Sequence, residues 1–481
     1  MKRTGIYCLI VCLILCLTGC GADGGQDQAV QENAVDDPAS SSADAGEGQT
    51  DTPDSSADDQ DDRQALSVVI AMPFRDTTDK IIAYNESSPS YYIDARLYGG
   101  GVKMAEILDT KLTLEILSGK GPDLVIWDQD MYTPSLASEK LMENLYDFMD
   151  ADPDFHMEDY YENILQAFEI DGGLYVLPAS FSVDTGCVRA EELEAGKGIA
   201  EGWELGEMMA AYENSSLAER FCTNFTKESM ISAMCRGCMG NFIDWGSGEC
   251  HFDTPEFVRL LEWCNTFPEE YVDFDPVEFY RSGKIFWRMT RLFTPWDTAF
   301  AREISGDADI LWPGYPVADG EQDLGGGVAE PFGMCFSICR NSSNKDAAWD
   351  FIKTWLTEDM QREVRGIPLL RSVSEERIQD ALTPEYETVD GVEQEKIKYE
   401  TAIVITEGVE EPIRLSCITE SDAEVYRSII ENTHRGYDNN PGVLDIILEE
   451  AGACFGGDKD AAEVADIIQN RVSIYVGERI D

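Results

Sequence analysis

Two short apolar stretches decide the fold class of this chain: residues 67–72 read SVVIAM, and residues 124–127 read LVIW. Neither stretch alternates apolar with polar residues, which is typical of strands that are buried on both faces. Residues 102–117 between them have a helical pattern, which stops at the GKGP of 119–122. A strand, a helix and a second strand form the βαβ unit of a parallel sheet. The sequence therefore predicts an α/β fold.

The chain continues as a mixture of strands and helices. Short apolar stretches at 174–177, 308–312 and 332–338 predict further strands, and Pro178 is expected to end the first of them. Apolar residues at helical spacing in 347–356 predict an amphipathic helix. The other predicted helices cover about 134–149, 158–169, 203–213, 226–238, 254–266, 422–432, 441–455 and 461–475.

Several of these helices carry recognisable end signals. Asn344 is suited to cap the 347–356 helix, and Asn440-Pro441 is a cap followed by a first-turn proline. Trp349 and Trp355 lie on the apolar stripe of the first of these helices, so we expect both in the core.

Four sequence stretches, taken in order, resemble one family. They are LSGKGPDLV at 117–125, GLYVLP at 173–178, AAWDFI at 347–352 and GIPLLRSV at 366–373. Their order and spacing are similar to those of the extracellular solute-binding proteins of ABC importers, in the carbohydrate-binding family. The resemblance implies a two-lobe fold like that of class II periplasmic binding proteins, with crossing hinge segments and C-terminal helices. It also implies a ligand held between the lobes, closure on binding and docking to a membrane permease.

The expected lobes are interleaved along the chain. We predict a first lobe at 66–178, completed by about 290–338, and a second lobe at 179–289, completed by about 339–481.

Candidate ligand-binding residues follow from where ligands bind in such folds. In an open parallel sheet, ligands sit beyond the carboxyl ends of the strands. A sugar also needs aromatic platforms beside polar groups that pair with its hydroxyls. For each tryptophan, ordinary core packing is the alternative. The candidates are Arg75, Asp76, Trp127, Asp128, Phe181, Ser182, Asp184 and Trp245, together with Trp296 and Asp297, which the resemblance to the family implies.

The N-terminus predicts export. Lys2 and Arg3 precede an apolar run at 5–17, which is followed by small residues. This run is shorter than the roughly 20 residues that a membrane-spanning helix needs. The LTGC of 17–20 resembles the bacterial lipobox, which implies cleavage after a signal peptide of residues 1–19 and a lipid on Cys20. An ordinary signal peptide with an incidental cysteine is the alternative.

The stretch after the lipobox differs in composition from the rest of the chain. Residues 21–65 contain no aromatic residue and no Lys, and they are rich in Asp, Ser, Ala and Gly. Such a segment cannot bury enough apolar surface to fold, so residues 20–65 are predicted to form a disordered acidic tether that begins at the lipidated cysteine. Membrane attachment through Cys20 then places the protein on the outer face of the cytoplasmic membrane.

The charge of the chain excludes one class of partner. The formal net charge is −57, with only 36 Lys and Arg residues. Because phosphate backbones require a basic surface, nucleic acid is not an expected partner. No later segment is apolar and long enough to predict a transmembrane helix.

The cysteines leave two possibilities open. Four of the 14 (Cys8, Cys12, Cys16 and Cys20) lie in the leader, and the other ten could be paired or reduced. Cys235-x-x-Cys238, with Cys250-His251, has residue types that zinc prefers. The first pair lies in a predicted helix, however, where cysteine commonly packs as a small apolar residue. We expect neither a metal nor a cofactor.

The sequence gives little support for catalysis. A glycoside hydrolase needs two carboxylates at a set separation, and no pair stands out among the 93 acidic residues. The histidines, at positions 156, 251 and 434, are scattered, and neither a Gly-x-Ser-x-Gly nor a phosphate-loop motif is present. The chain is predicted not to be an enzyme.

The prediction from sequence is therefore a lipid-anchored, monomeric protein that captures a sugar or oligosaccharide for an ABC permease. Two alternatives keep the fold: a subunit that presents its ligand to a sensor, and a binder of peptides or other solutes. Residues 383–419 look like an added hairpin or loop.

Overall fold

The computed structural model describes most of the chain after residue 62. The described ranges are 63–71, 75–97, 104–128, 140–193, 202–223, 225–271, 276–306, 308–317, 325–389, 391–404, 410–437 and 440–480. The predicted signal peptide, Cys20 and nearly all of the acidic tether lie outside these ranges. Within them, no helix combines the length and the apolar character needed to cross a membrane.

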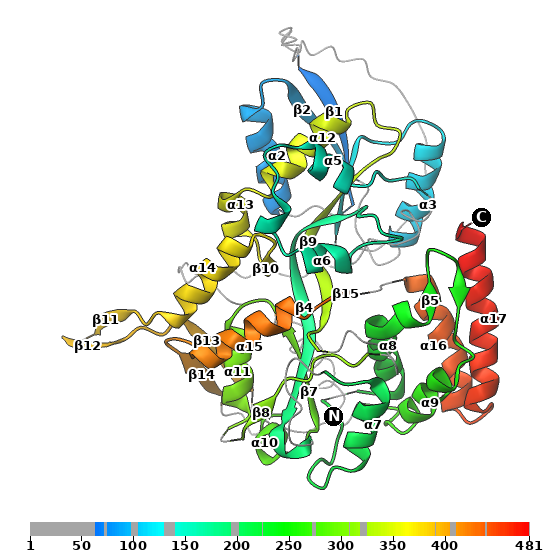
Figure 1. Ribbon diagram of the computed structural model, residues 1–481, viewed down its shortest axis with the longest axis vertical. Helices are drawn as coiled ribbons and strands as arrows, with labels where there is room; N and C mark the ends of the chain where they lie inside the picture. Colours follow the sequence, from blue (N-terminus) through cyan, green and yellow to red (C-terminus); the bar gives the residue numbers. More distant parts are fainter. Residues whose placement is uncertain are drawn as a thin grey trace, which may run out of the picture. The chain divides into compact units, whose positions relative to one another are not determined.

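The predicted parallel unit is present. Strand β1 (Gln64–Ile70) pairs in parallel with β2 (Tyr91–Leu97) and with β3 (Leu124–Asp128). Helix α2 (Arg75–Ser87) leads from β1 to β2, and α3 (Met104–Leu117) leads from β2 to β3 (Figure 1). The sequence pattern missed α2 and β2. Because β2 is the edge strand and the last four of its residues are exposed, it lacks a continuous apolar run.

Two long strands carry the sheet beyond this unit. The strand order is β10-β4-β9-β3-β1-β2, and β4 (Leu177–Arg189) pairs antiparallel with β9 (Val328–Ile338). The expectation that Pro178 ends the strand is wrong, because β4 runs on for eleven residues beyond it. The pairing with β9 shifts register between Pro178 and Ser180, which accommodates a residue that cannot donate to the ladder.

The outer half of β4 pairs with further strands. Its last residues pair with β7 (Trp287–Leu292) and β8 (Ile310–Leu311), and its early residues pair with β10 (Ile367–Pro368). All but the last of the residues of β4 are buried. A strand buried on both faces must carry a different core on each.

The side chains of β4 and β9 alternate between these two faces. On the first face, Phe181 and Val183 join a large apolar cluster, the first core, with Leu66 of β1 and Ile126 of β3. On the second face lie two separate clusters. The third core contains Val69, Val125, Trp127, Val176 and Cys335, and the second core contains Val188, Trp287 and Val328.

The helices divide between the cores (Figure 1). Helices α12 (Lys345–Thr354), α14 (Arg371–Leu382) and α15 (Glu420–Glu431) contribute to the first core, and Trp349 and Trp355 are buried there, as expected. The second core is built from α8 (Lys227–Cys238), α9 (Pro255–Cys264), α16 (Pro441–Phe455) and α17 (Ala461–Ile480).

The packing of residues 345–431 differs from the predicted division into lobes. That division placed 339–481 with the second lobe, whereas α12, α14 and α15 pack in the first core with β1 and β3. Residues 441–480, in α16 and α17, pack in the second core with side chains from 188–287. Helical periodicity shows which face of a helix is buried but not which core receives it.

The helix caps explain several boundaries. The Asn440 side chain accepts from the Val443 backbone N–H, which confirms the predicted start of α16. Asn344 precedes α12, but its side chain donates to Asp123 instead of capping the helix. The remaining elements are α5 (Tyr146–Ala151), η2 (Met157–Asp159), α6 (Glu162–Ala167), η3 (Ala190–Glu192), α7 (Leu205–Glu213), η4 (Met239–Asn241), β5 (Ile243–Asp244), β6 (Glu249–Cys250), α10 (Pro276–Ser282), α11 (Trp296–Ile304), α13 (Glu358–Glu363), β11 (Tyr386–Val389), β12 (Val392–Glu395), β13 (Tyr399–Val404), β14 (Glu410–Leu415) and β15 (Arg435–Gly436).

No disulfide bond joins any of the ten cysteines of the described body, and nine of them are buried. Cys235 and Cys238 lie on α8 in the second core, and the Cys238 Sγ donates to the Pro316 carbonyl at 3.4 Å. Burial raises the pKa of the Cys238 thiol to about 11. These cysteines therefore pack as small apolar side chains.

The closest packing against β4 gives a test of the fold. A Cβ atom added to Gly186 would lie 1.8 Å from Nε1 of the buried Trp287. We expect Gly186→Ala to lower the free energy of unfolding by about 1–3 kcal/mol, because the indole cannot move within a packed core. Gly240→Ala is the control, since a Cβ atom there meets nothing within 4 Å. Urea denaturation that found the two variants equally stable would contradict this packing.

Candidate ligand-binding site

A polar band interrupts the second face of the sheet, between the third core and the second core. Ser182 and Asp184 on β4 alternate with the first-core residues of that strand, so both side chains lie on the second face. Glu330 on β9 and Arg291 on β7 reach the same band, because Ser182 pairs with Glu330 and Asp184 pairs with Arg291. Three neighbouring strands thus bring these four polar residues together.

An ion-pair triad forms the centre of the band. Arg291 donates from Nε to Asp184 Oδ1 at 2.6 Å and from Nη2 to Asp184 Oδ2 at 2.8 Å. Its third nitrogen, Nη1, lies 2.6 Å from Glu330 Oε2. The carboxylate side chains are only 11% and 9% exposed, whereas that of Arg291 is 34% exposed. One guanidinium therefore holds two nearly buried carboxylates in fixed positions.

The charges of the triad depend on one another. Burial lowers the pKa of Arg291, but the hydrogen bonds and the charge of Asp184, together with the charge of Glu330, more than reverse this and raise it. Ser182 Oγ is buried beside them and has no hydrogen-bond partner among the described residues. The band therefore offers fixed carboxylate acceptors and a partly exposed guanidinium donor.

Tyr437 adds an aromatic group to the same region. Its backbone N–H donates to the Ala329 carbonyl at 2.7 Å, next to Glu330. Its hydroxyl accepts from Arg236 Nη1 at 2.7 Å, and the guanidinium of Arg236 lies over its ring. Burial raises the pKa of Tyr437 to about 12, so its hydroxyl stays protonated at neutral pH. A ring beside charged donors and acceptors is the pairing that saccharide binding needs.

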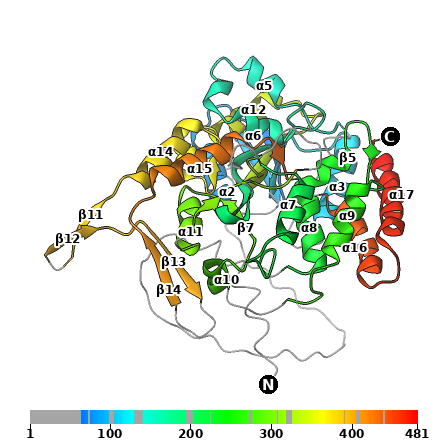
Figure 2. The ribbon, with the colours of Figure 1, turned by 60° about the horizontal axis from the view of Figure 1, so that its bottom comes forward.

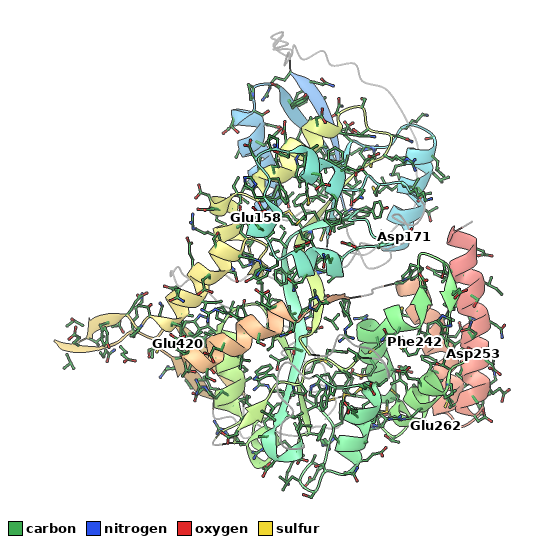
Figure 3. All side chains as sticks on the ribbon, viewed as in Figure 1. Glu158, Asp171, Phe242, Asp253, Glu262 and Glu420 are labelled. Carbon is green, nitrogen blue, oxygen red and sulfur yellow. The ribbon has the colours of Figure 1, made fainter. Side chains whose placement is uncertain are left out.

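Two loops from distant parts of the chain contact each other. Asp171 and Gly172 form a tight turn with positive φ angles of 51° and 71°. Opposite them, the β5–β6 hairpin carries Trp245, which is half-buried against the second core. A Cβ atom added to Gly246 would lie 3.1 Å from Asp171 Oδ1, so the two loops are in contact. Figure 3 labels Asp171 and, below it among the second-core helices, Phe242.

Two of the predicted aromatic contacts lie in the cores. Trp127 is 2% exposed in the third core, and its Nε1 donates to Ser337 Oγ at 2.9 Å. Phe181 is fully buried in the first core. The alternation of β4 and β9 explains both placements, because neighbouring apolar positions supply the surrounding side chains. Contact of either residue with a ligand remains a prediction.

The predicted residues on α11 lie apart from the band. Trp296 stacks on Tyr399 of β13, with ring centroids 5.7 Å apart and planes at 8°. Asp297 accepts from the backbone N–H groups of Phe293 and Thr294 at 2.8 and 2.7 Å. Burial raises the pKa of Asp297 to about 6. Both side chains therefore have local structural partners.

The predicted set is only partly brought together. Ser182 and Asp184 share the band, and Trp245 lies on the β5–β6 hairpin. Arg75 and Asp76 begin α2 and Asp128 ends β3, but their side chains lie outside the described part of the structure. Sequence reasoning missed Arg291, Glu330 and Tyr437. Glu330 could have been identified from the sequence, because it is the one charged residue in the otherwise largely apolar stretch 328–338.

Comparisons with known proteins agree with this architecture. A model of the family described as "Bacterial extracellular solute-binding protein" matches residues 102–375. No curated protein matches the sequence.

Solved structures match over most of the chain. The sugar-binding protein MalE from Xanthomonas citri is 14% identical, with a TM-score of 0.51, and the match covers 86% of this chain and 98% of MalE. A structure described as a directed-evolution variant of a de novo designed esterase is 13% identical, with a TM-score of 0.51 and coverages of 87% and 100%. A family 1 extracellular solute-binding protein from Alicyclobacillus acidocaldarius is 14% identical, with a TM-score of 0.49 and coverages of 86% and 98%. At these identities the likeness shows the fold alone, and the match to MalE confirms the predicted α/β fold of the two-lobe binding proteins.

The triad makes a testable prediction about stability. Arg291→Met leaves two nearly buried carboxylates without a counter-charge, and we expect it to lower the free energy of unfolding by about 2–3 kcal/mol. The triple variant Asp184→Asn, Glu330→Gln, Arg291→Met removes all three charges and should regain most of that loss. Chemical denaturation compares the two. A triple variant no more stable than the single variant would show that the unpaired carboxylates do not cause the loss of stability in Arg291→Met.

Asp297 predicts a dependence of stability on pH. Its pKa of about 6 in the folded state exceeds the ordinary value of 3.8, so the folded state binds the proton more tightly. The folded protein therefore loses stability as pH rises from about 4 to about 6. Asp297→Asn lacks this titration, so its stability relative to the native chain should rise by up to about 3 kcal/mol across that window. A difference that stayed constant from pH 4 to pH 6.5 would show that Asp297 does not titrate there.

Proposed function

The chain belongs to the family of bacterial extracellular solute-binding proteins, and from that premise we propose that it captures a sugar or oligosaccharide between two lobes. The observation that carries this proposal is the polar band on β4, β7 and β9. Its charged groups are placed where an apolar sheet face would otherwise continue from the third core into the second. Burying such charges costs free energy, which a ligand with matching hydroxyl groups offsets.

The chemistry of the band suits a saccharide. Asp184 and Glu330 provide acceptors for hydroxyl hydrogens, and the exposed part of Arg291 provides a donor for hydroxyl oxygens. The rings of Tyr437 and Trp245 can lie against the C–H faces of a sugar. MalE of Xanthomonas citri, which shares the fold, is described as sugar-binding. The proposed role is binding without catalysis.

Closure would be a hinge motion of the crossing segments. The Thr185 hydroxyl donates to the Gly326 carbonyl at 3.1 Å, and the Gly327 N–H donates to the Thr433 hydroxyl at 3.0 Å. Strand β15 then pairs with the start of β9. Hydrogen bonds thus join three segments that lead from one core to another: β4 at Thr185, the chain at 326–327 before β9, and the chain at 433–436 that includes β15. A ligand that contacts groups on both sides of these segments would stabilise the closed arrangement.

Anchoring and delivery complete the proposal. Lipidation of Cys20 and a solvated tether that ends before β1 begins at Gln64 would hold the protein on the outer face of the cytoplasmic membrane as a monomer. From there it would pass its ligand to the permease subunits of an ABC transporter. The lipobox resemblance and the family membership support these two steps.

Binding to the secreted part, residues 21–481, tests the proposal. A saccharide that binds only the folded state should stabilise it by about 2.7 kcal/mol at a hundredfold excess over its dissociation constant. We expect Glu330→Gln to weaken binding of that saccharide about tenfold or more in isothermal titration calorimetry, because it removes a charged acceptor. Glu228→Gln, on the exposed surface of α8, is the matched control and should bind normally.

Other outcomes would separate the alternatives. Stabilisation by a peptide, with no response to any saccharide, would overturn the assignment of the ligand. A saccharide that is bound and recovered cleaved would overturn the absence of catalysis.

A further inference from the structure

An inserted hairpin, β11–β12, concentrates exposed apolar side chains on an acidic support. Eleven large apolar residues are described as exposed, and four of them lie within residues 386–397. These are Tyr386, Val389, Val392 and Ile397, which are 60%, 44%, 65% and 41% exposed. Every residue of both strands is exposed. The hairpin also lies outside the family match, which ends at residue 375.

The base of the hairpin is firmly attached. Lys398, only 9% exposed, donates to the Asp380 carbonyl at 2.7 Å and to its carboxylate at 3.0 Å, at the end of α14. It also forms an ion pair with Glu385 at 3.2 Å. Just beyond it, Tyr399 stacks on Trp296 of α11. The hairpin therefore leaves the body from a fixed position, and Figures 1 and 2 show it projecting away from the helices.

The two strands cannot account for their own stability. A two-stranded hairpin without a third strand or a helix against it is marginally stable in water. Val389 pairs with Val392 next to the turn, so their side chains form one small apolar patch on one face. Exposed apolar side chains gathered on a projection are typical of a protein interface.

The negative charges of the hairpin indicate which partners can bind it. Glu387, Glu393 and Glu395 lie on the strands, and the strands contain no Lys or Arg. A second copy of this chain would bring these carboxylates and two bodies of strongly negative charge together, so it is disfavoured. Anionic lipid headgroups are disfavoured for the same reason.

We propose that the β11–β12 hairpin docks onto another protein, at a surface where Lys or Arg residues surround an apolar patch. The valine pair fills the patch, and the glutamates pair with the surrounding cations. Because no other strand among the described residues pairs with β11 or β12, the partner can also add a strand to the hairpin. This docking does not depend on the ligand that the chain binds.

Photo-crosslinking of the full-length chain in the bacterium that produces it tests the proposal. A benzophenone amino acid replaces Val392, and in the control it replaces Ile474, which is 63% exposed on α17. We expect an adduct with one other protein at position 392 and not at 474, with the crosslinked peptide of the partner rich in Lys or Arg.

Two double variants, each of which removes two glutamate charges, complete the test. Glu387→Gln with Glu393→Gln should reduce the yield of the adduct at least fivefold, because it removes two of the three carboxylates on the strands. Glu228→Gln with Glu463→Gln removes as much charge from exposed positions on α8 and α17, and it should leave the yield unchanged. An adduct between two copies of this chain, an adduct with lipid, equal yields from the two double variants, or no adduct at position 392 would each overturn the proposal.

Discussion

The pairing of β4 with β9 is the constraint on which the rest of the structure depends. Both strands are buried on both faces over most of their length, so one face serves the first core and the other serves the third and second cores in turn. The chain crosses between cores on these strands, and their register determines which side chains meet. The helices and the shorter strands pack against a framework that this single antiparallel pair defines.

The polar band follows from that register. Placing Asp184, Glu330 and Arg291 between two apolar clusters lowers the stability of the folded protein. Apolar residues of similar size at such positions commonly give a protein that is as stable or more stable. The pairing of all three limits that cost and fixes their positions. A fixed set of charged acceptors and donors at the level where the chain crosses between cores is what a binding protein with a hinge requires.

The sequence predicts the parallel βαβ unit, but it predicts neither the full length of β4 nor the ion-pair triad. The apolar runs at 67–72 and 124–127 were sufficient for the parallel unit, because strands buried on both faces have no polar positions to obscure them. The prediction that Pro178 ends a strand is wrong, because a register shift between Pro178 and Ser180 accommodates the proline and β4 continues. The triad could not be found, because Arg291 and Glu330 meet Asp184 only through pairings between strands distant in the chain. The sequence signal at Trp127 also could not reveal that its indole donates to Ser337 within the third core.

The central claim is that the polar band holds the ligand. A crystal structure of residues 21–481 grown with the saccharide that stabilises them would test it most directly. The account predicts sugar hydroxyl groups within hydrogen-bonding distance of Asp184, Glu330 or Arg291, with an aromatic ring against the sugar face. A saccharide bound elsewhere, with the triad covered by protein and untouched, would contradict it.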